Sequence, residues 1–128
     1  YLNKTDVVQV INSNNYLFFW AGRNEKRRGI SHFALQYIGP RTWSERFRYS
    51  VTMRTLDDKQ TLTEHSNTTH YHDNTYEVMR VHKCTWFYND FISMCLDPYD
   101  TLWLDIDAQF ISLDKEMPDK EIPENIFV

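Results

Sequence analysis

Histidines gather in the second half of the chain, and they are the side chains with the widest chemical capability. Four of the five histidines fall between positions 65 and 82, with a carboxylate and a thiol close by: His65, His70, His72, His82, Asp73 and Cys84. Imidazole, thiolate and carboxylate groups are the usual ligands of zinc and related metals. In an extended segment His70 and His72 would point to the same side, as two ligands of one metal must.

The elements expected around these histidines argue against a metal site. Residues 66–73 are polar and are interpreted as a long loop, and His82 is expected to lie a strand away from it. A structural metal normally needs four ligands held by rigid elements. We therefore expect solvated loop histidines, no bound metal and no cofactor.

Other catalytic patterns are weak. Asp105 and Asp107 stand two residues apart and would share one face of a strand, where carboxylates usually serve solubility. Three glycines can hardly build a phosphate-binding loop, and no G-x-S-x-G nucleophile motif occurs. We expect no catalytic residues in this chain.

A basic segment holds Arg23, Lys26, Arg27 and Arg28. Binding of nucleic acid would call for interleaved aromatic residues and more positive charge, whereas the chain has a net charge of -4. The segment is expected to be a solvated hairpin tip, with an acidic partner as the alternative. No run approaches the roughly 20 apolar residues of a spanning helix, so neither nucleic acid nor membrane is an expected partner.

The two cysteines, Cys84 and Cys95, are expected to be free buried thiols, although one disulfide is the alternative. Two glycosylation tripeptides, beginning at Asn3 and Asn67, would fit a secreted protein. Such tripeptides arise by chance in chains rich in Asn and Thr. A reducing compartment is the better interpretation, and we expect a cytoplasmic protein that can also be nuclear.

The elements that must position these residues are short strands. At 128 residues the chain is one domain by length, and aromatic residues make up 16% of it, which suits a core built on large rings. Apolar runs alternate with polar turns, and only residues 90–96 resemble a helix. This pattern predicts an all-β antiparallel sandwich of about seven to eight strands, and we assign strands to residues 7–11, 16–21, 32–38, 46–56, 60–65, 75–81 and 102–111.

Two of these strands have a clear inner and outer face. Phe47, Tyr49, Val51 and Met53 alternate with polar residues and are predicted to be core. In the last strand the inner set is predicted to include Leu104, with Asp105 and Asp107 on the outer face. Trp103 also falls on that outer face.

The stretch from Phe33 to Met53 contains the pattern F-A-L-Q-Y-I-G-x-R-x-x-x-E-x-F-x-Y, and it resembles the substrate-binding domain of the Seven-in-absentia (SINA/SIAH) ubiquitin ligases. The similarity extends over roughly residues 4–112 and includes the segments that begin at Asp6, Asn15, Thr61 and Lys83. It implies a TRAF-like sandwich that dimerises and recognises extended peptides of substrates or adaptors. Residues 1–112 are therefore expected to form this domain.

The resemblance also suggests where a peptide would bind. The family's peptide groove uses an aromatic residue and a methionine on the first strand, and the matching positions here are Val7 and Gln9. A partner peptide would then lie along the first strand, at Asp6, Val7, Val8, Gln9 and Val10. The family's RING and zinc fingers need Cys-x-x-Cys pairs, which this sequence lacks, so the ligase module would have to lie elsewhere.

The changes at Val7 and Gln9 favour an alternative, a RING-less dimerising scaffold that has lost the peptide groove. In either case we expect a homodimer, with Trp103 as a candidate interface residue. Residues 113–128 form an acidic tail that contains two prolines and ends in apolar residues. That tail is either a solvated terminus or a segment that docks on the domain and competes with the partner peptide.

Overall fold

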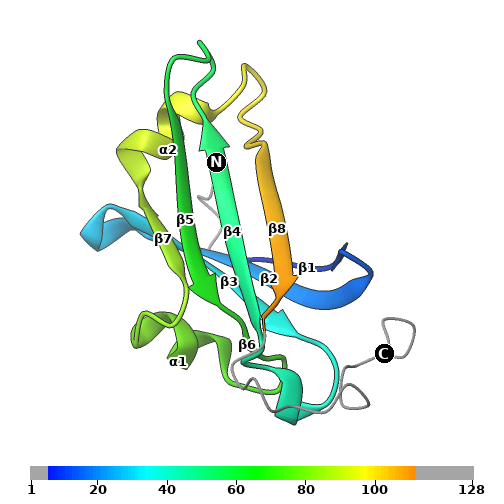
Figure 1. Ribbon diagram of the computed structural model, residues 1–128. Helices are drawn as coiled ribbons and strands as arrows, with labels where there is room; N and C mark the ends of the chain where they lie inside the picture. The colour runs from blue at the N-terminus through cyan, green and yellow to red at the C-terminus, as the bar shows by residue number, and fades with distance from the viewer. Residues whose placement is uncertain (1–5, 112–128) are drawn as a thin grey trace.

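A computed structural model describes residues 6–111, which form two β-sheets packed face to face (Figure 1). Eight strands build the sheets: β1 (Asp6–Ser13), β2 (Tyr16–Glu25), β3 (Ile30–Tyr37), β4 (Phe47–Arg54), β5 (Thr61–Asn67), β6 (Thr69–His70), β7 (Thr85–Tyr88) and β8 (Leu104–Phe110). Two short α-helices, α1 (Thr75–Arg80) and α2 (Asn89–Cys95), and two 3-10 turns, η1 (Lys26–Arg28) and η2 (Arg41–Trp43), connect them.

The strand order confirms the predicted all-β sandwich. The first sheet has the order β1-β2-β3-β6, and β7 pairs with β3 on the same side as β6. The second sheet has the order β5-β4-β8. All pairs are antiparallel except β3 with β6. In Figure 1 the strands of the second sheet stand in front of the first and cross it steeply.

The core lies between the sheets and consists largely of aromatic rings. The predicted inner face of β4 is confirmed, because Phe47, Tyr49, Val51 and Met53 are all buried. From the first sheet, β2 and β3 contribute alternate residues to the same cluster, which include Phe18 and Phe33. The Phe47 ring links the two layers through a T-shaped contact with Phe18 and a tilted contact with Tyr37.

The predicted faces of β8 are also confirmed, although its inner face is only partly covered. Leu104 is half-buried and packs against the core, while Asp105 and Asp107 are exposed. Trp103 precedes the strand and is exposed, as expected for an outward residue. Because β8 is an edge strand, fewer side chains cover it than cover β4.

A tight hairpin joins β1 to β2. Asn14 and Asn15 form its two-residue turn with φ angles of 53° and 69°, a conformation that asparagine tolerates better than most residues. The Asn12 side chain accepts a hydrogen bond from the Asn15 backbone. The turn fixes the pairing register, which runs from Ser13 opposite Tyr16 to Asp6 opposite Arg23.

One predicted strand is wrong: residues 75–81 contain helix α1. The segment alternates Tyr76 and Val78 with polar residues, which mimics a strand. However, the Asn74 side chain accepts the backbone N–H of Glu77 and caps a helical turn. The helix then buries the adjacent pair Val78 and Met79 on one side.

Two short strands were not predicted. β6 lies within residues 66–73, for which the sequence predicts a polar loop, and β7 covers four residues for which it predicts no element. The helix expected at residues 90–96 is confirmed as α2, which buries Ile92 and Cys95 against the core. Neither α-helix, nor any other helix within residues 6–111, is long and apolar enough to cross a membrane.

Helix α1 covers part of the outer face of the first sheet. Val78 and Met79 pack there with Cys84 and with two small residues of the sheet, Ala21 and Ala34. Alanines at these two positions let the helix approach the strands closely. A second, smaller core results, separate from the main one, and it holds α1 beside β2 and β3.

Candidate functional site

Strand β1 lies at the rim of the first sheet, and among residues 6–111 it pairs with β2 alone. Because the turn has two residues, Ser13 and Tyr16 form a hydrogen-bonded pair, and such pairs recur at every second residue. Ile11 and Gln9 thus direct their backbone groups toward β2. Val8 and Val10 direct theirs toward the open edge, where a further strand could pair.

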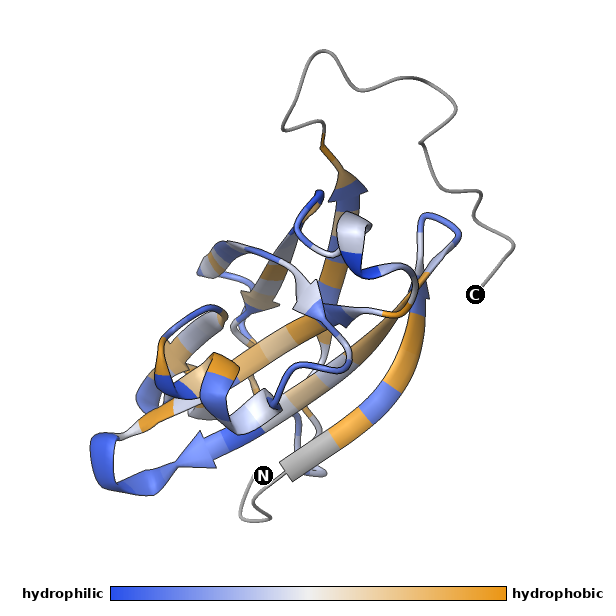
Figure 2. Ribbon diagram, turned by 90° about the horizontal axis from the view of Figure 1, so that it is seen from below, coloured by the Kyte–Doolittle hydropathy of each residue, from blue (hydrophilic) through white to orange (hydrophobic). Residues whose placement is uncertain are grey.

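The side chains of Val8 and Val10 are also free. They are 54% and 58% exposed, a high value for valines on adjacent positions of one face. Figure 2 shows the hydrophobic colour running along β1 at the margin of the molecule. The edge therefore offers backbone donors and acceptors together with an apolar surface.

An apolar cavity of about 310 Å³ adjoins this surface. It lies between β1, β2 and α1 on the outer face of the first sheet, and its walls include Val8, Phe19, Ala21, Tyr76 and Met79. The backbone of Gly22 also lines it, although a Cβ atom at this position would point to the other face of the sheet, within 3.0 Å of the Phe33 ring in the main core. The packing of the main core therefore requires a small residue at this point of β2.

Arg23 and Tyr76 border the cavity at the end nearest the start of β1. The Arg23 guanidinium stacks over the Tyr76 ring at 3.9 Å from its centroid. Such a contact holds α1 against β2 and leaves a cation at the border of an apolar site. An incoming ligand would meet apolar walls with one positive group at the border.

The sequence placed the candidate peptide-binding residues on this strand. Asp6 and Val7 lie opposite Arg23 and Gly22 of β2. Gln9 is exposed and pairs with Trp20, so its side chain points to the opposite face from Val8 and Val10. The cavity on the Val8 face was not predicted, because most of its wall comes from β2 and from α1, for which the sequence pattern predicts a strand.

The far end of β1 is closed by the second sheet. Asn14 donates hydrogen bonds to Asp107 and to the Ala108 carbonyl, and Ser13 accepts one from the Ala108 backbone at 3.0 Å. These bonds connect the hairpin to β8. The open part of the edge is therefore the first half of β1.

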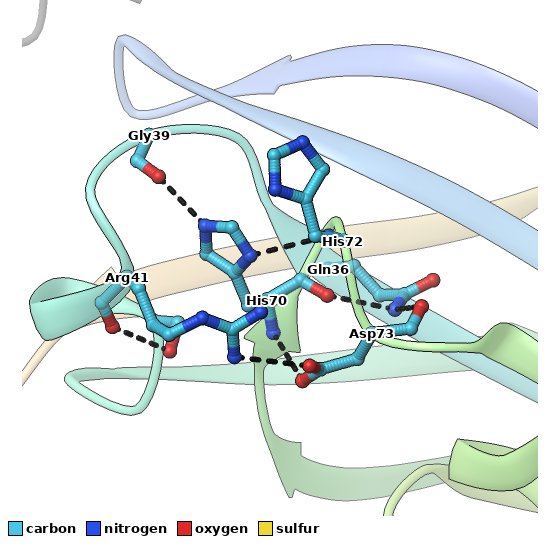
Figure 3. Close-up of polar contacts among 7 residues, drawn as sticks. Gln36, Gly39, Arg41, His70, His72 and Asp73 are labelled. Atoms are coloured by element: carbon cyan, nitrogen blue, oxygen red, sulfur yellow. Dashed lines mark hydrogen bonds and ion pairs between the residues drawn. The ribbon is translucent and has the colours of Figure 1, made fainter.

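His70 has a structural role in a hydrogen-bonded network (Figure 3). It is buried, which corrects the expectation that it would be a solvated loop residue. Its Nε2 donates to the Gly39 carbonyl at 2.9 Å, and its Nδ1 accepts from the His72 backbone. With both ring nitrogens engaged, His70 has no lone pair for a metal.

Asp73 binds the same network from the next turn. Its carboxylate accepts from Arg41 at 3.0 Å and from the His70 backbone at 3.1 Å. Gln36 donates to the carbonyl groups of His70 and Asp73, which connects the turn to β3. Burial acts to raise the pKa of Asp73, but the bonds from Arg41 and His70 outweigh it, so the pKa lies below its usual value.

The other predicted histidines do not join His70 in a common site. His65 is exposed on β5, and His82 is exposed just after α1. Among residues 6–111 no three His, Cys, Asp or Glu side chains are placed so that they could hold a metal ion. Cys84 and Cys95 are both buried, as predicted, and both are free thiols.

His32 was not singled out in the sequence, yet it forms the closest contacts among ionisable groups in the sheet. Its Nε2 donates to Glu25 at 2.9 Å, which lowers the pKa of that carboxyl group. The Cys84 thiol faces its Nδ1 at 3.7 Å. A nucleophile, a base and an orienting acid are thus aligned, but burial raises the pKa of the Cys84 thiol to about 12 and leaves it unreactive.

Trp103 is 73% exposed beside the second sheet. Its indole N–H donates to Asp97 at 3.1 Å, which fixes the ring without covering it. Leu56 and Met94 are exposed nearby, and the Leu56 backbone donates to the Met94 carbonyl. These residues form an apolar surface at the end of the sandwich away from α1.

Comparison of the sequence with known protein families finds no family model that matches, and no curated protein matches it either.

Proposed function

We propose that this domain recognises extended peptides of protein partners, as the SINA/SIAH substrate-binding domains do, and that it serves a ubiquitin ligase of that type. One observation carries the proposal. The first strand is an open edge with two exposed valines, and an apolar cavity adjoins it. Addition of a strand to such an edge is a recurring mode of peptide recognition.

In this mode the backbone would supply affinity and the cavity would supply selectivity. A peptide beside β1 would pair with the outward N–H and C=O groups of Val8 and Val10. Its side chains on the outer face would lie against the two valines, and a long apolar one would extend toward Met79 and Phe19. Arg23 at the border favours a peptide with an acidic residue near that end.

The experiment is a selection from a displayed peptide library, followed by calorimetric titration of the selected peptides. Val8→Pro removes the outward donor but leaves the pairing with β2, because that N–H faces the open edge. It should weaken binding about tenfold, the effect of one lost backbone hydrogen bond plus the steric cost of the ring. The melting temperature should change little.

Val8→Ala is the matched control. It shortens the same side chain and keeps the backbone donor, so it separates the contribution of the cavity from that of the edge. Peptides that bind Val8→Pro as tightly as the parent would move the site away from β1. The tail, residues 113–128, lies outside the described residues; if it competes for the edge, truncation after Leu113 should raise the affinity.

A RING-less dimerising scaffold is the second candidate function, and the surface around Trp103 favours it. Trp103, Leu56 and Met94 are large apolar residues exposed close together at one end of the domain. Contiguous exposed apolar residues commonly mark a protein interface. Failure of the peptide selection together with a dimer that depends on Trp103 would favour this candidate over the first.

A further inference from the structure

The fold brings the basic turn beside two aromatic rings that are distant from it in sequence. A cavity of about 430 Å³ is lined by Arg28, Ile30, His82, Trp86 and Tyr88. In Figure 1 the light-blue turn between β2 and β3 projects on the same side of the molecule as β7. Nucleic acid was not an expected partner because the basic segment has no interleaved aromatic residues, yet the structure supplies them from β7.

The rings are presented on the outer face of the first sheet. Trp86 pairs with His32 and Tyr88 pairs with Ile30, so both side chains point away from the main core. They are 38% and 62% exposed. Their centroids are 5.2 Å apart in a T-shaped contact, which leaves ring surface open for a planar group to stack on.

Positive charge borders these rings. Lys26, Arg27 and Arg28 are all exposed on η1. Among the described residues Lys26 and Arg27 form no ion pair, and Arg28 has a long contact of 3.7 Å with Glu25. The whole chain is acidic, with a net charge of -4, so a cationic turn on it is a local feature that a general excess of lysine and arginine does not explain.

His82 occupies a backbone position that usually belongs to glycine. Its φ is 61°. At the end of α1 the His82 N–H donates to the Met79 carbonyl, and the Lys83 N–H donates to the Val78 carbonyl. This arrangement is a Schellman motif, in which the left-handed residue is most often glycine. A histidine at this position costs stability and places an imidazole in the wall of the cavity.

We propose that this surface binds single-stranded nucleic acid. One base stacks against Trp86 and Tyr88, and the adjoining phosphates lie against Lys26 and Arg27. Arg28 and His82 donate hydrogen bonds to the base or to a phosphate inside the cavity. Combining a stacking platform with a cationic border is the general solution for binding single strands without strong sequence preference.

The site is separate from the proposed peptide edge. β1 and β7 lie at opposite edges of the first sheet, with β2 and β3 between them. An acidic peptide would also be attracted by the cations, but it has no need of two exposed ring surfaces. The rings therefore favour nucleic acid over a peptide, and the experiment below discriminates between them.

The test uses the full chain and a labelled oligouridine of about ten nucleotides, within the length that one small domain covers. Fluorescence anisotropy should show binding at low salt that weakens as salt rises. Trp86→Ala should weaken binding about tenfold, whereas Trp86→Phe should keep most of it, since a ring remains. Tyr99→Ala is the matched control, because that ring is 87% exposed and lies between α2 and β8, outside the walls of this cavity.

The contribution of charge is measured by the salt dependence. Arg27→Ala should reduce the slope of log K against log salt by about 0.7, the value for one phosphate contact of a single strand. Lys59→Ala removes the same charge from the exposed loop between β4 and β5 and should leave the slope unchanged. His82→Gly should weaken binding while the melting temperature does not fall.

Three results would overturn the proposal. One is the absence of binding at low salt. A second is equal binding by the Trp86→Ala variant, which would show that the binding comes from nonspecific attraction to the positive charges and not from stacking on the ring. The third is equally tight binding of a polyglutamate of the same charge, which would identify an acidic protein segment as the partner. Because the site excludes β1, Val8→Pro should leave the binding of oligouridine intact.

Discussion

At the scale of single residues, Tyr49 links the two sheets by a buried hydroxyl group. It donates to the Phe33 carbonyl at 3.0 Å and accepts the Thr85 backbone N–H at 3.2 Å. Burial raises the pKa of this phenol well above its ordinary value. The hydroxyl therefore stays protonated, and it connects β4 to β3 and β7 where no strand pairing does.

Tyr49→Phe tests the role of that hydroxyl group. The change keeps the ring but leaves the Thr85 N–H buried without its partner, which should lower the free energy of unfolding by about 1–3 kcal/mol. Urea denaturation would measure the loss. Tyr99→Phe is the control, because Tyr99 is 87% exposed, and an equal loss in that variant would argue against a specific effect at Tyr49.

His82→Gly should make the protein more stable. The left-handed conformation costs a histidine roughly 1–2 kcal/mol, and the substitution removes this cost. Part of the benefit is lost because glycine has greater conformational freedom in the unfolded chain. We expect a net increase of about 0.5–1 kcal/mol in the free energy of unfolding, measured by denaturant midpoint. Val81→Gly, one residue earlier, has a negative φ of -95° and should be destabilising. A loss of stability in His82→Gly would show that packing against His32 outweighs the backbone cost.

At the scale of elements, the carboxylate of Asp73 stabilises the turn after β6. Asp73 bonds to Arg41 in η2 and to the backbone of β6, and its pKa is lowered in the folded state. A group with a lowered folded pKa contributes stability above its unfolded pKa, near 4. That contribution is lost as the pH falls through the folded value.

In the Asp73→Asn variant the free energy of unfolding should therefore depend less on pH in the acidic range. Since both partners are partly exposed, the loss at pH 7 should be modest, about 1 kcal/mol or less. The difference between variant and parent should shrink as the pH falls below about 4. Thermal melts across pH would measure it, and Asp105→Asn serves as an exposed control. A difference that stays constant with pH would assign the effect to packing instead.

Prediction from sequence succeeded where a local pattern decides the structure. The alternation in β4 was assigned correctly, and so was the break between the strands predicted at residues 7–11 and 16–21, where the structure has the turn between β1 and β2. The pattern failed at α1, because alternating apolar residues outweighed the capping signal at Asn74. It also missed β7, whose four residues are too few to show a period.

The candidate sites depend on contacts that no local pattern reports. The sequence indicated the first strand through its resemblance to a family. The cavity beside Val8 needs Met79 of α1, and the cavity beside Arg28 needs Trp86 of β7. Each pair is distant in the chain and is brought together by the sheet order. Only the tertiary arrangement could place them.

At the scale of the whole molecule, the expected homodimer remains a prediction. Sedimentation at micromolar concentration should give twice the 15.5 kDa of the chain, and Trp103→Ser should shift the species toward monomer. Trp86→Ser, another partly exposed indole, should leave the dimer intact. A monomer for the parent chain at that concentration would rule out the dimer.

Strand β3 occupies a special place in the sheet order. It pairs with β2 on one side and with β6 and β7 on the other, and all eight of its residues are buried. Its amide protons should therefore exchange with deuterated solvent only when the entire domain unfolds, whereas those of β1 can exchange through local opening at the rim. The ratio of the two exchange rates then measures how readily the rim opens, and a ligand bound at β1 would slow exchange there, because the rim must release the ligand before it opens.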